Sequence, residues 1–189
     1  SNSLTLITPE KRKNFAEQVN RILKRIPLNP ETSKINLEPI RKKIWGISTE
    51  DGRVLSCLSS GQKSLLGIAS LIALNTVLHN SLWADVLAFD DFTSALDLNQ
   101  IPKLTSLLRQ IAYGSGFPTK DNDQTYRRQI FIVSHHEDLT NKLLDFLIPP
   151  PERTMKVINF TGWSPENTGS PGPTFEVFNI APSPSHTED

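Results

Sequence analysis

Apolar residues recur at helical spacing near the start of the chain. Their separations of four, three, one and three positions place them on one face of a helix. These residues are Phe15, Val19, Ile22, Leu23 and Ile26. Thr8 and Pro9 supply an N-cap hydroxyl and a proline at the first helical position, and Pro27 ends the pattern. The pattern predicts an amphipathic helix over residues 8–26, either the base of a coiled coil or a surface helix.

The following stretch, residues 33–57, alternates apolar and polar side chains and reads as extended. The pair Asp51-Gly52 is typical of a tight turn between two strands. The sequence therefore predicts a hairpin whose strands cover residues 44–48 and 53–57.

The middle of the chain alternates between the two periodicities. A helix is expected at residues 63–79, and because it is apolar nearly all round it should be buried on most sides. Short apolar runs at 84–89 and 129–134 predict buried parallel strands. Helical spacing returns at 98–111, with Asp97 as a candidate N-cap, and at 137–145. This alternation predicts an α/β fold with a mainly parallel sheet flanked by helices, plus short antiparallel strands.

Beyond the last of these helices the pattern weakens. Residues 113–128 and the Pro-rich region after Pro149 predict loops, without identifiable chemistry. Short strands are expected at 146–148, 156–160 and 175–180. The expected organisation is a basal helix (1–26), one lobe (27–181) and a disordered tail (182–189).

Charge adds one observation. The chain of 189 residues carries 20 basic and 20 acidic side chains, but residues 1–53 hold 11 basic and 6 acidic ones. This excess indicates either a solvated helix face or a surface that contacts duplex DNA. The DNA-contact candidates are Lys11, Arg12, Lys13, Lys24 and Arg25. One cysteine and no membrane-length apolar run favour a cytoplasmic protein with no membrane partner.

Candidate chemistry gathers where the predicted strands end. Asp90 and Asp91 follow the first strand, and His135 follows the second, so parallel pairing would bring them to one edge. A carboxylate there suits Mg²⁺, and a second one can orient an attacking water. The Gly-containing loop at residues 58–62 precedes a helix, where phosphate binds well. An Asp-Asp pair also fits other metal sites, and His135 could equally be a helix-cap partner or an exposed loop residue.

Taken in order, these segments resemble the motifs of the ABC ATPase superfamily. Residues 58–62 resemble the signature motif, with Ser60 where glycine is more usual, and residues 86–91 resemble the Walker B strand. Residues 94–97 resemble the D-loop, and residues 133–135 the switch-histidine segment. The 28 positions from Gln62 to Asp90 exceed the spacing in transporters. The chain therefore resembles the C-terminal head segment of an SMC-like (coiled-coil DNA-repair or chromosome-maintenance) ATPase.

The resemblance implies that two dimerised heads hold ATP and Mg²⁺ between them. Such heads would act on DNA in repair, chromosome maintenance or phage defence, in a prokaryotic cytoplasm or nucleoid rather than a nucleus. A nuclease or other effector subunit would be a further partner. Asp90 would hold Mg²⁺, Asp91 would position the attacking water, and His135 would contact the γ-phosphate. The residues that would complete the opposing head's site in trans are Ser59, Ser60, Gly61, Gln62 and Asp97.

Three departures qualify this picture. No glycine is followed by lysine, so the Walker A loop is expected in an N-terminal half that completes the head. Asp91 stands where the catalytic glutamate is usual, and Phe92 where proline is usual. The shorter Asp91 leaves open an ATP-gated DNA clamp or sensor with weak hydrolysis. A transporter nucleotide-binding domain is the third alternative.

Overall fold

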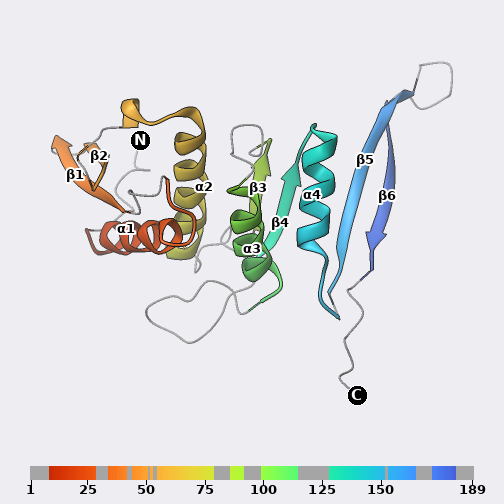
Figure 1. The fold of residues 1–189 in the computed structure, drawn as a ribbon, viewed down its shortest axis with the longest axis horizontal. Coiled ribbons are helices and arrows are strands. Elements are labelled where there is room, and N and C mark those ends of the chain that lie inside the picture. The colour runs from red at the N-terminus through yellow and green to blue at the C-terminus, as the bar shows by residue number, and fades with distance from the viewer. Residues whose placement is uncertain are drawn as a thin grey trace. The chain divides into compact units, whose positions relative to one another are not determined.

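The order of elements follows the alternation of the sequence. A computed structural model describes residues 9–28, 34–41, 44–50, 52, 55–78, 86–91, 99–114, 128–151, 153–164 and 172–181. The helices are α1 (Pro9–Leu23), α2 (Ser60–Val77), α3 (Ile101–Ala112) and α4 (Glu137–Leu147), with a short 3₁₀ helix η1 (Leu55–Cys57). The strands are β1 (Ile35–Arg41), β2 (Ile44–Thr49), β3 (Val86–Asp90), β4 (Gln129–Val133), β5 (Met155–Ser164) and β6 (Gly172–Ile180) (Figure 1). The chain divides into two compact units, residues 1–146 and 147–189.

The strands of the described residues form three two-stranded sheets. Among the strands that the structure describes, only β3 and β4 pair in parallel, whereas β1–β2 and β5–β6 are antiparallel. The α/β character is therefore confirmed, but the expectation of a mainly parallel sheet is not supported. Hydrophobic periodicity identified the strands, but it does not reveal how many neighbours each strand has.

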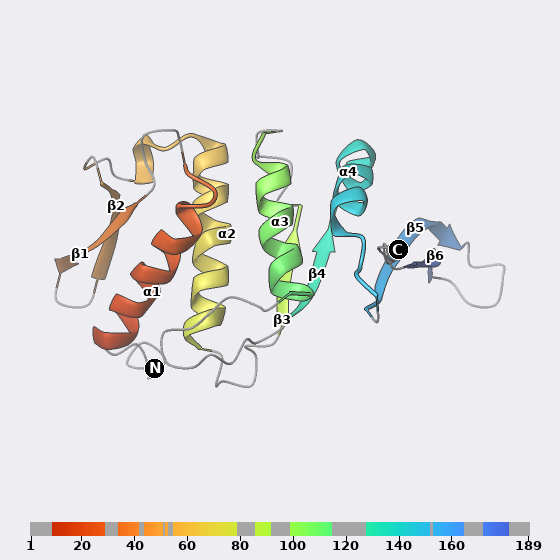
Figure 2. The same cartoon turned by 60° about the horizontal axis from the view of Figure 1, so that its bottom comes forward.

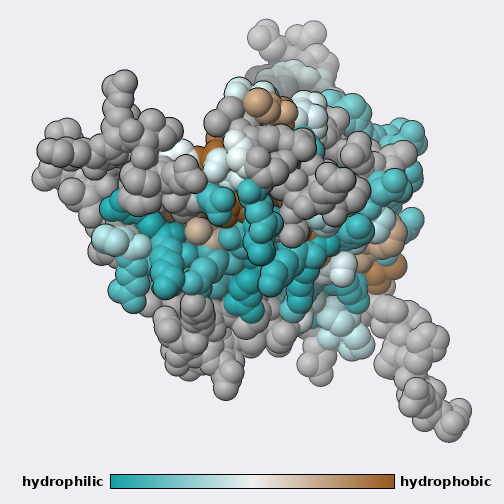
Figure 3. All heavy atoms as spheres, turned by 60° about the vertical axis from the view of Figure 1, so that its left-hand side comes forward, coloured by the Kyte–Doolittle hydropathy of each residue, from teal (hydrophilic) through white to brown (hydrophobic). Residues whose placement is uncertain are grey.

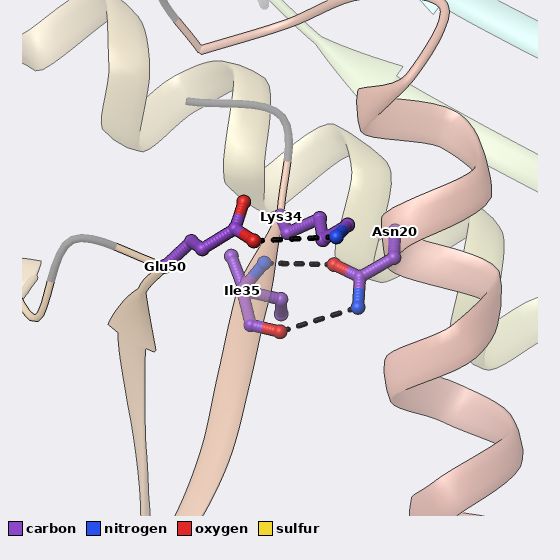
Figure 4. Close-up of polar contacts among 4 residues, drawn as sticks. All are labelled: Asn20, Lys34, Ile35 and Glu50. Carbon is purple, nitrogen blue, oxygen red and sulfur yellow. Dashed lines mark hydrogen bonds and ion pairs between the residues drawn. The ribbon is translucent and has the colours of Figure 1, made fainter. Parts of the chain in front are cut away.

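The first helix forms as its apolar stripe predicts. Val19, Ile22 and Leu23 of α1 are buried, and α1 packs against α2. Asn20 then ties α1 to β1, because its Oδ1 accepts from the backbone N–H of Ile35 at 2.7 Å and its Nδ2 donates to the Ile35 carbonyl at 3.2 Å (Figure 4). Beside it, Lys34 and Glu50 form an ion pair at 3.2 Å. The N-terminal helix is thus held in the first unit by both packing and backbone recognition.

The long apolar helix α2 lies beside α1, and β3 follows it in the chain (Figures 1 and 2). Its apolar side chains are mostly buried, although Leu71 and Leu74 remain exposed. The buried residues are Leu65, Leu66, Ile68, Ala69, Ile72, Ala73 and Thr76. The prediction of a helix buried on most sides is therefore confirmed, with one partly exposed flank.

The predicted hairpin at Asp51-Gly52 is wrong. Gly52 does lie in a turn, with φ of 78° and its N–H donating to the Thr49 carbonyl at 2.9 Å. However, β2 pairs with the preceding β1, and residues 55–57 form η1 instead of a returning strand. A turn signal fixes local backbone conformation, but which strand pairs with which depends on the surrounding packing.

Two smaller expectations also fail. Residues 146–147 belong to the end of α4, not to a strand. The N-cap of α3 is Gln100, so Asp97 does not cap it, and Gln100 makes no side-chain capping hydrogen bond. Pro102 is accommodated in the first turn, as expected, where its missing N–H costs no intrahelical hydrogen bond.

The parallel pair is buried on one face only. On β3, Leu87 and Phe89 are buried while their neighbours are exposed, so this strand is half-buried. On β4, Phe131 is 51% and Val133 61% exposed. The expectation of buried strands is therefore wrong, because alternate side chains of both strands are exposed within the described residues.

The second unit contains the β5–β6 hairpin. Met155 pairs with Ile180 and Ser164 with Gly172, and a bulge lies between Phe160 and Gly162. Its apolar side chains are largely exposed, and they are Ile158, Phe160, Trp163, Phe175, Val177 and Phe178. The strands predicted here form, but they are longer than expected. The predicted tail, 182–189, lies outside the described residues.

Candidate functional site

The parallel register brings the carboxylates and the histidine to one edge. Asp90 is opposite Val133, and the next backbone N–H, that of Asp91, donates to the Val133 carbonyl at 2.9 Å. His135 follows two residues later, and its Nδ1 lies 3.2 Å from Oδ1 of Asp91. The predicted meeting of these residues at one sheet edge is therefore confirmed. Asp91, and not Asp90, is the direct neighbour of His135.

Asp90 and Asp91 differ in environment although they are adjacent. Asp90 is exposed at the end of β3, on the same face as Phe131 and Val133 of β4. Asp91 is partly buried, and its φ of 42° lies in the left-handed region. Aspartate tolerates this region better than most residues, and such conformations concentrate at functional sites. The chain thus turns sharply between the two carboxylates and presents them in different directions.

The start of the same strand pair is fixed by Asn75 of α2. Its Nδ2 donates to the Val86 carbonyl at 3.1 Å, and its Oδ1 accepts from Nε of Arg128 at 2.6 Å. Arg128 is buried, and its backbone N–H donates to the carbonyl of Ile111 in α3 at 3.2 Å. This network joins α2, α3, β3 and the residue before β4. Sequence reasoning missed it, because an asparagine on an apolar helix carries no pattern of its own.

The signature-like loop closes the N-terminus of α2 with a capping box. Oγ of Ser59 accepts from the Gln62 backbone N–H at 3.2 Å, and Oε1 of Gln62 accepts from the Ser59 N–H at 2.9 Å. Nε2 of Gln62 also donates to the Leu28 carbonyl at 3.3 Å. Gln62, expected to reach a nucleotide in trans, is therefore engaged within its own chain. Ser59 and Ser60 are exposed, as an anion-binding helix start requires.

The direction of α2 places this loop toward the edge that carries Asp90. Asn75, near the end of α2, bonds to Val86 at the start of β3, so helix and strand run in opposite directions. Figures 1 and 2 both show the N-terminal end of α2 on the side toward which β3 and β4 point. A helix N-terminus and the strand-end carboxylates thus share one side of the first unit.

The DNA-contact candidates lie on α1 and in the turn after it. Lys11, Lys13, Lys24 and Arg25 are exposed, and Arg12 is partly exposed. Nη1 of Arg25 also donates to Oε1 of Gln110 in α3. The described residues on the side of the molecule that carries α1 are largely hydrophilic (Figure 3). This exposure fits the solvated-face interpretation and the phosphate-contact interpretation equally well.

Some predicted site residues lie outside the described part of the chain. They are Asp97 and the rest of the D-loop-like segment, together with Phe92. Conversely, the structure places one residue that was not predicted, His136, close to Asp91 and His135. One ligand atom from each of Asp91, His135 and His136 lies within 4.8 Å of the others. The sequence signal was the pair of adjacent histidines, of which only His135 was considered.

Comparison with solved structures defines the class of fold. No protein-family model matches the sequence, and no curated protein matches it. The chain has a fold similar to that of SMC head domains. Three of the similar structures are identical to this chain at 14–15% of positions, so the likeness concerns the fold alone. The resemblance inferred from the motifs is therefore confirmed at the level of the fold.

Three of these structures illustrate the similarity. One, from work on ATP-driven dimerisation and DNA-stimulated activation of SMC ATPases, has a TM-score of 0.56 at 15% identity and covers 91% of this chain and 86% of its own. The Smc head of Pyrococcus yayanosii, with a coiled coil and joint, has a TM-score of 0.54 at 14% identity. The match covers 90% of this chain and 27% of the Pyrococcus yayanosii chain. The Smc head of Pyrococcus furiosus, bound to the C-terminal domain of ScpA, has a TM-score of 0.52 at 15% identity. The match covers 90% of this chain and 35% of the Pyrococcus furiosus chain. The chain thus spans about a third of the two Pyrococcus chains. No helix among its described residues is long and apolar enough to cross a membrane.

Proposed function

We propose that this chain is the C-terminal half of an SMC-like ATPase head, which holds ATP and Mg²⁺ between two dimerised heads and hydrolyses ATP. The observation that carries the proposal is the strand edge at which Asp90, Asp91 and His135 meet. Open α/β folds place ligands outside the carboxyl ends of parallel strands. The N-terminus of α2 lies on the same side of the first unit as these strand ends. The head-domain fold supports the same interpretation.

Asp90 fits the requirements of Mg²⁺. Its carboxylate is exposed at the strand end, and Mg²⁺ takes one or two protein carboxylates while keeping several waters. When bound with ATP, the ion would neutralise phosphate charge. Asp91, 3.2 Å from His135, would orient the attacking water and accept its proton, while the His135 ring would donate toward the γ-phosphate.

The signature-like loop would complete the site of the opposing head. Ser59, Ser60 and Gly61 would present a hydroxyl and backbone N–H groups to phosphate in trans. Gln62 would act mainly by holding this loop in shape, because its amide already bonds Ser59 and Leu28. Asp97 would link the two sites across the interface.

An N-terminal half that carries Walker A is the required partner. Parallel strands are normally buried on both faces, yet Phe131 and Val133 are more than half exposed. A second lobe packed against this face would cover them and would supply the lysine that cradles the triphosphate. Lys11, Arg12, Lys13, Lys24 and Arg25 would then contact duplex DNA near the coiled-coil base.

The proposal is tested by assembling this chain with a Walker A-bearing N-terminal half and measuring mass by light scattering. Addition of ATP and Mg²⁺ should convert the monomeric head to a dimer, and ADP should not. Replacement of Ser59 by Arg, which places a bulky cation at the loop, should prevent dimerisation. A head that stays monomeric with ATP would contradict the shared site.

A second candidate function is an ATP-gated DNA clamp or sensor with weak hydrolysis. The observation that favours it is Asp91 itself, whose short side chain is held in a left-handed turn against His135. In this case ATP would dimerise the heads on DNA with little turnover. Dimerisation together with rapid hydrolysis would exclude the clamp and favour the ATPase.

A further inference from the structure

Three side chains of metal-ligating type meet where β3 and β4 end. Asp91, His135 and His136 each offer one ligand atom, and these atoms lie within 4.8 Å of one another. The proposed ATP site uses Asp91 and His135, but it gives His136 no role. The second imidazole changes the chemistry of the cluster, because two nitrogen ligands and one carboxylate do not suit Mg²⁺, which prefers oxygen.

The separations suit a small tetrahedral ion. Two ligand atoms that are each about 2.0–2.1 Å from Zn²⁺ lie roughly 3.4 Å apart. The distance of 3.2 Å between Oδ1 of Asp91 and Nδ1 of His135 already matches this value. The His136 ring is exposed, so rotation about its side-chain bonds can close the remaining gap.

Hydrogen bonds hold the backbone of two of the three ligands in place. The Asp91 N–H donates to the Val133 carbonyl at 2.9 Å, and the His136 N–H donates to Oγ of Ser134 at 3.3 Å. Thr140 donates from both its backbone N–H and its Oγ1 to the His136 carbonyl, each at 2.9 Å. The backbone at these two ligands is therefore already in place, and only side-chain rotation has to be ordered when an ion binds.

The helix dipole of α4 is an electrostatic feature that disfavours a cation at this site. His136 precedes α4, and the positive end of a helix dipole disfavours a cation. Glu137 and Asp138 in the first turn of α4 offset this cost with two carboxylates. The ring centroids of His135 and His136 lie 4.1 Å apart, which is close enough for the two imidazoles to bind one ion.

We propose that Asp91, His135 and His136 bind a divalent transition-metal ion that favours imidazole, with Zn²⁺ as the test ion. Zn²⁺ is commonly held by histidine nitrogens together with a carboxylate, and sites with three protein ligands are typical where a position stays open. The ion would hold the turn after β3 against the loop before α4.

The consequence for hydrolysis rests on the proposed function. An ion on Asp91 and His135 would remove the carboxylate that orients water and the imidazole that contacts the γ-phosphate. Zn²⁺ would then inhibit a complete head. The ATP turnover of each head, wild-type or variant, is compared with and without Zn²⁺. A variant that is slower without zinc can therefore still be scored for inhibition.

The test is calorimetric titration of Zn²⁺ into the full 189-residue chain, without nucleotide. The Cys57→Ser background is used because that thiol is exposed and would bind zinc by itself. One Zn²⁺ should bind per chain, and excess Mg²⁺ should not displace it. His136→Asn should weaken binding at least about 10-fold, because loss of even an outer-shell partner costs on the order of 10–100-fold.

His186→Asn provides the matched control, since it removes a histidine that is distant in the sequence. It should leave zinc affinity unchanged, and circular dichroism should show that both variants keep their helices. Absence of saturable binding, or equal affinity in the His136→Asn variant, would overturn the proposal. Because the titration contains no ATP, its failure leaves the ATPase proposal standing. If the chain binds zinc but forms no active head, the ATPase proposal is refuted and the zinc proposal stands.

Discussion

Ser59 stabilises the N-terminus of α2 through a hydrogen bond that its neighbour Ser60 does not share. Its Oγ accepts from the Gln62 N–H, and replacement by Ala would leave that N–H without its cap. We expect Ser59→Ala to lower the free energy of unfolding by about 1 kcal/mol in urea denaturation. Ser60→Ala, at the first helical position, is the matched control and should be close to neutral. Equal losses in the two variants would show that the capping box contributes nothing specific.

Asp91 should limit the rate of hydrolysis in a complete head. Glutamate extends the carboxylate by one C–C bond, about 1.5 Å, and a misplacement of roughly 1 Å can cost on the order of 100-fold in rate. We therefore expect Asp91→Glu to raise ATP turnover by about 10-fold or more in a steady-state phosphate-release assay. Asp91→Asn keeps the length of the side chain but removes the base, and should lower turnover. A lower ATP turnover in the Asp91→Glu head would mean that the left-handed turn at this position requires aspartate.

The strand-edge residues could be predicted from the sequence because the ends of parallel strands meet. Asp90, Asp91 and His135 each follow an apolar run directly, so pairing alone brings them together. Asn75 and the bond from Gln62 to Leu28 could not be predicted, since both depend on how distant elements pack. The roles assigned to the predicted residues stay predictions.

At the scale of elements, Asn75 connects α2 to the start of the strand pair. Asn75→Ala removes a hydrogen bond to the Val86 carbonyl and one to the buried Arg128 side chain. Hydrogen bonds to charged groups contribute about 1.5–3 kcal/mol, so we expect a loss of roughly that size in urea denaturation. Asn141→Ala, on the exposed side of α4, should change stability by less than about 0.5 kcal/mol. A loss at Asn75 as small as the control would mean that water replaces both bonds.

Helices were predicted more accurately than strand pairing. The stripes of α1 and α3 specify a buried face whatever lies opposite, so their residues could be listed in advance. The hairpin at Asp51-Gly52 failed because the alternating pattern suits either partner, and β2 pairs with β1. The exposure of β4 could not be anticipated, since an apolar strand looks the same whether or not its second face is covered.

At the scale of the whole molecule, the exposed face of β3–β4 should be the surface that an N-terminal half covers. Phe131→Ser removes an apolar side chain that is 51% exposed on this face. We expect it to reduce co-purification with a Walker A-bearing half at least about 5-fold, because a buried Phe contributes about 1.5–3 kcal/mol. Phe146→Ser, on α4 and 46% exposed, is the matched control and should assemble normally. Equal assembly of both variants would place the interface elsewhere.

The central claim, that Asp90 at the end of β3 holds the magnesium of a shared ATP site, is tested most directly by ATP turnover in the complete head. The account predicts that Asp90→Ala lowers the rate on the order of 100-fold, as expected when a reacting group loses its positioning. Asp145→Ala, which removes an exposed carboxylate from α4, should leave the rate unchanged. Normal turnover in the Asp90→Ala head would contradict the claim.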